Sequence, residues 1–138
     1  MEQYIVIKLG YMPGVDFLMQ HQKIIEENGF VDFARFGKKG LTRDDYSKNY
    51  IFIKECKGNG GRLIKAKLGE KILNGSVYPK YYENVMIYGV NWFRVTQMEE
   101  ISKEEFLKEY VLMNGNEIKA LDNGTVPFFY IKKRTDKN

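Results

Sequence analysis

Residues 50–68, YIFIKECKGNGGRLIKAKL, constrain the fold of this chain more than any other segment. Two runs typical of β-strands, YIFIKEC and RLIKAKL, are separated by KGNGG. Glycine readily adopts the backbone angles that tight connections between antiparallel strands require. A glycine-rich loop can also hold a phosphate, but such loops lead from a strand into a helix, and here a second strand pattern follows. The segment therefore predicts a glycine-rich β-hairpin.

Other patterns extend this hairpin to an α+β fold. A helix is expected from Asp16, with His21 on its apolar stripe and Asn28-Gly29 at its end. A second helix is expected after Ser102, which has the spacing of a capping box with Glu105. Further strands are expected at residues 4–9, 31–36, 85–89, 90–98 and 126–133, and a loop or one helical turn at 41–49. Together they predict a curled sheet or open β-barrel of about six strands flanked by two or three helices.

The chain of 138 residues is expected to form a single domain over residues 1–133, followed by a flexible tail at 134–138. Its one cysteine, Cys56, excludes an internal disulfide and fits a reducing, cytoplasmic location. The sequence has no run of about 18 apolar residues and no basic leader with a cleavage site. We therefore expect neither a membrane segment nor a signal peptide.

Side chains that commonly carry catalysis are sparse. His21 is the only histidine, and its place on an apolar stripe favours a packed structural role. Cys56 has no second cysteine or suitably spaced histidine, so no zinc site is predicted. The adjacent acidic pairs Glu26/Glu27, Asp44/Asp45 and Glu104/Glu105 fit helix surfaces and caps better than a shared site. We expect no metal or cofactor, and no residue pattern argues for an enzyme.

Positive charge is unevenly distributed along the chain. Between Arg35 and Lys71 there are eleven Lys/Arg and four Asp/Glu, a balance of +7, whereas the whole chain carries +4. Such asymmetry indicates either an anionic partner or a solvated basic face.

Aromatic side chains accompany this basic segment. Residues 28–40, NGFVDFARFGKKG, interleave three phenylalanines with basic residues, and three tyrosines lie within residues 78–82 beside Pro79. Aromatic rings stack on unpaired bases with a gain of roughly 1–3 kcal/mol per base, and basic side chains follow the phosphates. Strand aromatics are more often core residues, and Trp92 is either structural or a ligand contact. The pattern therefore leaves a core and a binding surface as alternatives.

The order of these segments resembles that of the YTH domains. QYIVIKLG is similar to their first strand, FxIKS, and FVDF lies where that family has a GVW segment. NYIFIKECKGNGGRLIKAKLGEK resembles their paired strands joined by SGxFxGxA. VMIYGVNWFRVTQMEEIS is similar to FxVxWxxxxxxPF, and NGNEIKALDNGT to DGQEIxxxxGT. The resemblance covers most of the chain and widens to the PUA-like barrels, which include the YTH, EVE and ASCH domains.

This resemblance implies a barrel with a pocket for a flipped-out, often modified base of RNA or DNA. In YTH readers an aromatic cage grips the methylated base. Phe33, or Val31 in the other register, is the counterpart of one cage residue. A second counterpart is Tyr78, Tyr81 or Tyr82, and Trp92 is a further candidate base contact. Because the family's cage tryptophans are replaced here, the identity of the bound base stays open.

The resulting hypothesis is a nucleic-acid-binding module. The basic residues that we expect to hold neighbouring phosphates are Arg35, Lys38, Lys39 and Arg43. One alternative is a protein-interaction or inhibitory module, encoded by a mobile element, whose basic face docks on an acidic protein. Another is a hydrolase that acts on modified nucleotides. Neither alternative involves a membrane.

Overall fold

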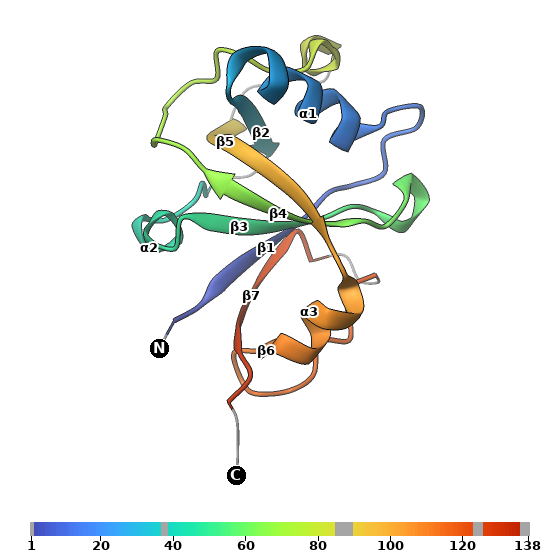
Figure 1. Ribbon diagram of the computed structural model, residues 1–138, viewed down its shortest axis with the longest axis vertical. Coiled ribbons are helices and arrows are strands. Elements are labelled where there is room, and N and C mark those ends of the chain that lie inside the picture. The colour runs from blue at the N-terminus through green and yellow to red at the C-terminus, as the bar shows by residue number, and fades with distance from the viewer. Residues whose placement is uncertain (1, 37–38, 85–89, 123–125, 136–138) are drawn as a thin grey trace. The chain divides into compact units, whose positions relative to one another are not determined.

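The computed structural model describes residues 2–36, 39–84, 90–122 and 126–135. They form an α+β fold with a mixed, open sheet of seven strands in the order β2-β5-β4-β3-β1-β7-β6 (Figure 1). The strands are β1 (Tyr4–Lys8), β2 (Val31–Phe36), β3 (Tyr50–Lys54), β4 (Leu63–Leu68), β5 (Val90–Ile101), β6 (Tyr110–Leu112) and β7 (Phe128–Lys133). The helices are α1 (Phe17–Asn28), α2 (Arg43–Ser47) and α3 (Lys103–Glu109), with short 3-10 helices η1 (Lys57–Asn59) and η2 (Lys80–Asn84). The α+β class is confirmed.

The chain divides into two compact units, each assembled from segments that are distant in the sequence. Unit 1 comprises Met1–Pro13, Ile51–Lys65 and Glu99–Asn138, and unit 2 comprises Gly14–Tyr50 and Ala66–Met98. The sequence patterns predicted one domain and gave no sign of this division. Each unit has its own buried residues.

In unit 1, β1 pairs in parallel with β3 and antiparallel with β7, which in turn pairs with β6. Tyr4–Ile7 and Ile51–Lys54 are buried at successive positions. Successive strand residues point to opposite faces, so both faces are covered, as the apolar pattern of residues 4–9 predicts. Ser102 caps α3 by accepting from the Glu105 amide, and Phe106 of that helix packs on Phe52. The predicted helix start is confirmed.

In unit 2, α1 lies against β2 (Figure 1). The Asp16 side chain accepts from the Met19 amide at the start of the helix, and Gly29 ends it with a φ of 87°. Both ends follow the sequence prediction. Strand β2 pairs antiparallel with β5 along its whole length, which sets Phe33 opposite Phe93. Side chains of directly opposed residues share a face of the sheet, so this register decides which residues meet.

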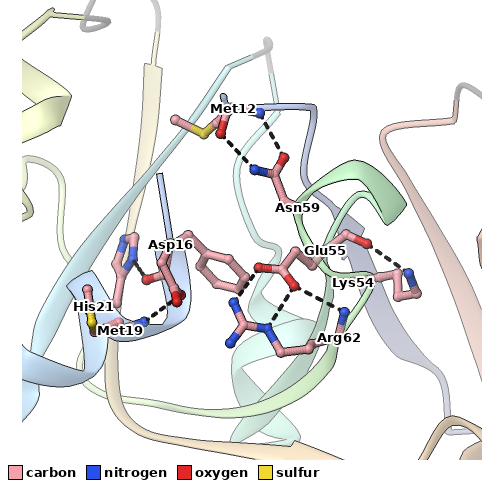
Figure 2. Close-up of polar contacts among 9 residues, drawn as sticks. Met12, Asp16, Met19, His21, Lys54, Glu55, Asn59 and Arg62 are labelled. Atoms are coloured by element: carbon pink, nitrogen blue, oxygen red, sulfur yellow. Dashed lines mark hydrogen bonds and ion pairs between the residues drawn. The ribbon is translucent and has the colours of Figure 1, made fainter. Parts of the chain in front are cut away.

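The predicted hairpin between β3 and β4 is confirmed, but its connection is longer and more structured than a tight turn. It contains η1, and two consecutive glycines, Gly60 and Gly61, have φ angles of 117° and 65°. Asn59 bonds to the Met12 backbone in both directions, at 2.8 and 2.7 Å (Figure 2). Arg62 then closes the connection by holding Glu55. The glycines thus serve a loop that is tied to the segment after β1.

Three details depart from the sequence patterns or lie beyond them. Strand β6 has no counterpart among the predicted elements. The strand expected at 85–89 lies outside the described residues. Arg134, assigned to a flexible tail, donates from its backbone to Glu109 and from its side chain to Glu117. The contacts of the described chain therefore include Arg134.

Candidate functional site

The five residues expected to contact a base all lie in one aromatic cluster of unit 2. The cluster consists of His21, Phe33, Tyr78, Tyr81, Tyr82, Trp92 and Phe93. Sequence reasoning assigned His21 to the core and gave Phe93 no role. Helix α1, strands β2 and β5 and the segment at η2 each contribute rings, so the cluster joins the main elements of the unit.

Phe33 lies inside this cluster and has almost no surface. Its ring is stacked on His21 at 4.0 Å between centroids and on Phe93 at 5.1 Å, and the residue is 3% exposed. Val31, the counterpart of the cage residue in the other register of the resemblance, is fully buried. Phe33 was expected to form a pocket wall, but here it packs as a core residue because α1 places the His21 ring against it.

A buried hydrogen-bond chain fixes His21 and Tyr82. The Nδ1 atom of His21 lies 2.7 Å from the Phe17 carbonyl, and Nε2 lies 2.7 Å from the Tyr82 hydroxyl. A carbonyl can only accept, so Nδ1 carries the hydrogen, and the Tyr82 hydroxyl donates to Nε2 of the neutral ring. Tyr82 also has hydrogen bonds with Tyr81 and with the Ala34 backbone.

Burial keeps these groups uncharged. It lowers the pKa of His21 to about 4, against a smaller opposite effect of the bond to Phe17. Burial likewise raises the pKa of Tyr81 to about 12 and raises that of Tyr82 well above its ordinary value. A charged form of any of them would lose its hydration without gaining a counter-ion. The core of the cluster is therefore neutral near pH 7.

The segment 77–82 covers the free edge of β2, which is an outer strand of the sheet. The Asp32 amide donates to the Val77 carbonyl at 2.7 Å, and the Ala34 backbone bonds to the Tyr82 hydroxyl. Unpaired strand edges invite association with other chains, and covering them with a loop prevents this. Part of the tyrosine-rich segment thus has a structural use that its composition did not reveal.

Tyr78, Tyr81 and Trp92 are half-buried and form the part of the cluster that solvent reaches. Tyr78 is stacked on Tyr82 at 5.7 Å between centroids and tilted by 43° against Trp92 at 5.3 Å. Buried contacts hold these rings, so little conformational freedom is left for a ligand to remove on binding.

Trp92 is also contacted by the backbone of Gly75. A Cβ atom at Gly75 would overlap the six-membered part of the indole ring. Gly75→Ala is therefore expected to displace Trp92 and to lower the free energy of unfolding by about 1–3 kcal/mol. Because Trp92 is the only tryptophan, its fluorescence spectrum reports the displacement during urea denaturation. Gly10→Ala is the matched control, since no atom lies within 4 Å of its added Cβ, and equal effects of both substitutions would contradict the expected contact.

On the sheet face that carries Trp92, Asp32 and Arg94 form an ion pair that the sequence patterns did not predict. They are cross-strand partners on β2 and β5, and Arg94 Nε lies 2.7 Å from Asp32 Oδ1. The guanidinium carbon also lies 3.9 Å from the ring centroid of Phe30. Burial acts to raise the pKa of Asp32, but bonds from Arg94 and from the Ser76 and Val77 amides outweigh it and lower that pKa. The carboxylate stays charged and anchors the start of segment 76–82.

The expected phosphate-binding residues lie on β2 and just after it. Arg35 is half-buried and donates to the Lys39 carbonyl at 3.5 Å, and Lys39 and Arg43 are exposed. Arg35 is opposite Asn91, and Ala34 is opposite Trp92. Lys38 lies outside the described residues. Arg35 is thus one residue along β2 from the position that faces Trp92. The side chains of Arg35 and Trp92 point to opposite faces of the sheet.

Comparisons with protein-family models, with curated proteins and with solved structures gave no match for this chain. None of the helices in the described ranges has the length and apolar character needed to cross a membrane. Function is therefore inferred from the arrangement of the chain's own residues.

Proposed function

We propose that this chain is a nucleic-acid-binding module with a PUA-like architecture, which holds an unpaired nucleobase against Tyr78, Tyr81 and Trp92. One observation carries the proposal: three half-buried aromatic rings are fixed by buried neighbours at the covered edge of β2. Rigid aromatic platforms stack on bases of any sequence because every base has a π-face. Phe33 and Tyr82 support the platform from within and do not touch the base.

Basic residues on β2 and after it in the chain support the same proposal. Lys39 and Arg43 are exposed, and Arg35 precedes them on β2. Phosphate contacts of such side chains release counter-ions, so binding should weaken steeply with salt. The similarity of segment order to PUA-like domains, including the paired central strands, favours a base-binding role over a protein-docking one.

The test is binding of labelled single-stranded RNA and DNA, unmodified and base-methylated, by fluorescence anisotropy at about 50 mM salt. Tyr78→Ala is expected to weaken binding by about 5- to 100-fold, because one stacked base contributes roughly 1–3 kcal/mol. Quenching of Trp92, the only tryptophan, should accompany binding.

Two variants control this experiment. Tyr78→Phe keeps the ring and should bind nearly as well as the original protein. Tyr11→Ala removes a tyrosine of unit 1 that is 63% exposed and does not belong to the cluster, and should have no effect. Absence of binding to every oligonucleotide, or an equal loss with Tyr11→Ala, would refute the proposed function.

A further inference from the structure

Two lysine side chains of unit 1, Lys54 and Lys103, pair with the carboxylate of Asp122, and the ammonium group of Lys8 donates to the Ala120 carbonyl at 2.8 Å. Lys54 Nζ lies 2.8 Å from Asp122 Oδ1, and Lys103 Nζ lies 3.5 Å from the same oxygen. Lys8 is the register partner of Lys54 on the parallel strand β1, so both side chains leave the same face of the sheet. These four residues are here called the lysine cluster.

Positive charge exceeds negative charge within the lysine cluster, since three ammonium groups accompany one carboxylate. The nearby Glu55 adds no free negative charge, because Arg62 holds its two oxygens at 2.8 Å each (Figure 2). Burial and then the charge of Lys54 lower the pKa of Lys8, against smaller opposite effects of Asp122 and Cys56. An anion would relieve this mutual repulsion of the lysines.

The position of Lys54 makes an anionic partner obligatory. Its side chain is only 1% exposed, and its ammonium group donates to Asp122 and to the Glu55 carbonyl at 2.7 Å. A buried ammonium without a counter-charge costs several kcal/mol. Asp122, in contrast, is 40% exposed and Lys103 is 43% exposed, so solvent reaches the outer part of the ion pair.

The backbone of the β3–β4 connection lies directly beside the ion pair of Lys54 and Asp122. Gly61, at a φ of 65°, lies beside it: an added Cβ would be 3.6 Å from Lys54 Nζ and 3.8 Å from Asp122 Oδ1. Lys8 and Lys54 are the last residues of the parallel strands β1 and β3. In open sheets, the carboxyl ends of parallel strands are a common place for ligands.

We propose that the lysine cluster is an oxyanion site, which takes a phosphate group in exchange for the Asp122 carboxylate. A phosphate offers more acceptor oxygens and more negative charge than one carboxylate, which suits three ammonium donors. Asp122 is the internal anion that keeps Lys54 paired when the site holds no ligand. This inference rests on unit 1 alone and is independent of the proposed base-binding function.

Thermal unfolding in inorganic phosphate, against sodium chloride of equal ionic strength, tests the site. Phosphate should raise the melting temperature of the original protein more than chloride does. Asp122→Asn removes the competing carboxylate, so its melting temperature should be lower in chloride and largely restored by phosphate. Its phosphate affinity should be about tenfold tighter, the equivalent of ~1.4 kcal/mol.

Lys8→Gln with Lys103→Gln should abolish the phosphate effect while leaving Lys54 and its partner in place. Lys108→Gln removes a lysine that is 74% exposed on α3 and should leave the effect unchanged. A phosphate effect no larger than that of chloride, or an Asp122→Asn variant that phosphate does not restore, would overturn the proposal. The oligonucleotide affinity that Lys8→Gln with Lys103→Gln loses separates the two sources: a loss only with a 5′-phosphate assigns a terminal phosphate, and an equal loss with and without it assigns the backbone.

Discussion

Asp32→Asn is expected to lower the free energy of unfolding by about 3–5 kcal/mol, the usual cost of removing one partner of a buried ion pair. Asp32 is fully buried and accepts from Arg94 Nε at 2.7 Å, from Arg94 Nη2 at 3.1 Å and from the Ser76 amide at 2.8 Å. An asparagine side chain presents an amide group to these donors and removes the negative charge. Urea denaturation measures the loss.

Glu70→Gln is the matched control for this prediction, because Glu70 binds the same guanidinium at 3.0 Å but is 75% exposed. Exposed ion pairs contribute about 0–1 kcal/mol, so this substitution should change stability little. A double-mutant cycle of Asp32→Asn with Arg94→Met isolates the coupling of the buried pair. If Asp32→Asn costs no more than Glu70→Gln, the carboxylate does not hold segment 76–82 in the way described above.

The Asp32–Arg94 pair illustrates what the sequence could and could not predict. Alternation along residues 31–36 predicted the strand. It also predicted that the side chains of Asp32 and Phe33 point to opposite faces, and the structure confirms both. Its partner lies 62 residues away and is set by the register between β2 and β5. Register depends on how whole strands pack, which local patterns do not determine. An acidic residue between Val31 and Phe33 was the one available signal of a buried partner.

The aromatic cluster shows the same limit. The apolar stripe of α1 correctly predicted a packed His21, and the structure places the five candidate base-binding residues in one aromatic cluster. Which of them stay accessible depends on β2 being an outer strand, because segment 77–82 covers that edge and buries Tyr82. Strand order follows from tertiary packing, so Tyr82 could not be separated from Tyr78 and Tyr81 by sequence alone.

His21 gives the second large expected effect, a loss of roughly 3 kcal/mol of stability as the pH falls from 6.5 to 4. The unfolded chain binds a proton at His21 near the ordinary pKa of 6.5, whereas the folded chain binds it only at about 4. Within this window the unfolded state holds more protons, so lowering the pH favours unfolding. Well above pH 6.5 both states are neutral at this residue, and the contribution is constant.

His21→Gln removes the titration, so the difference in unfolding free energy between the two proteins should shrink by this amount between pH 6.5 and 4. Taking the difference between the two proteins cancels the contribution of the carboxylates, which titrate in both. Because His21 is the only histidine, its imidazole NMR signals give its pKa in the folded protein directly, even if the variant does not fold. A pKa of His21 near 6.5 would mean that water reaches the imidazole ring in spite of the hydrogen bond from Tyr82. A pKa near 4 would establish that the ring is neutral near pH 7, as a hydrogen bond donated by Tyr82 to Nε2 requires.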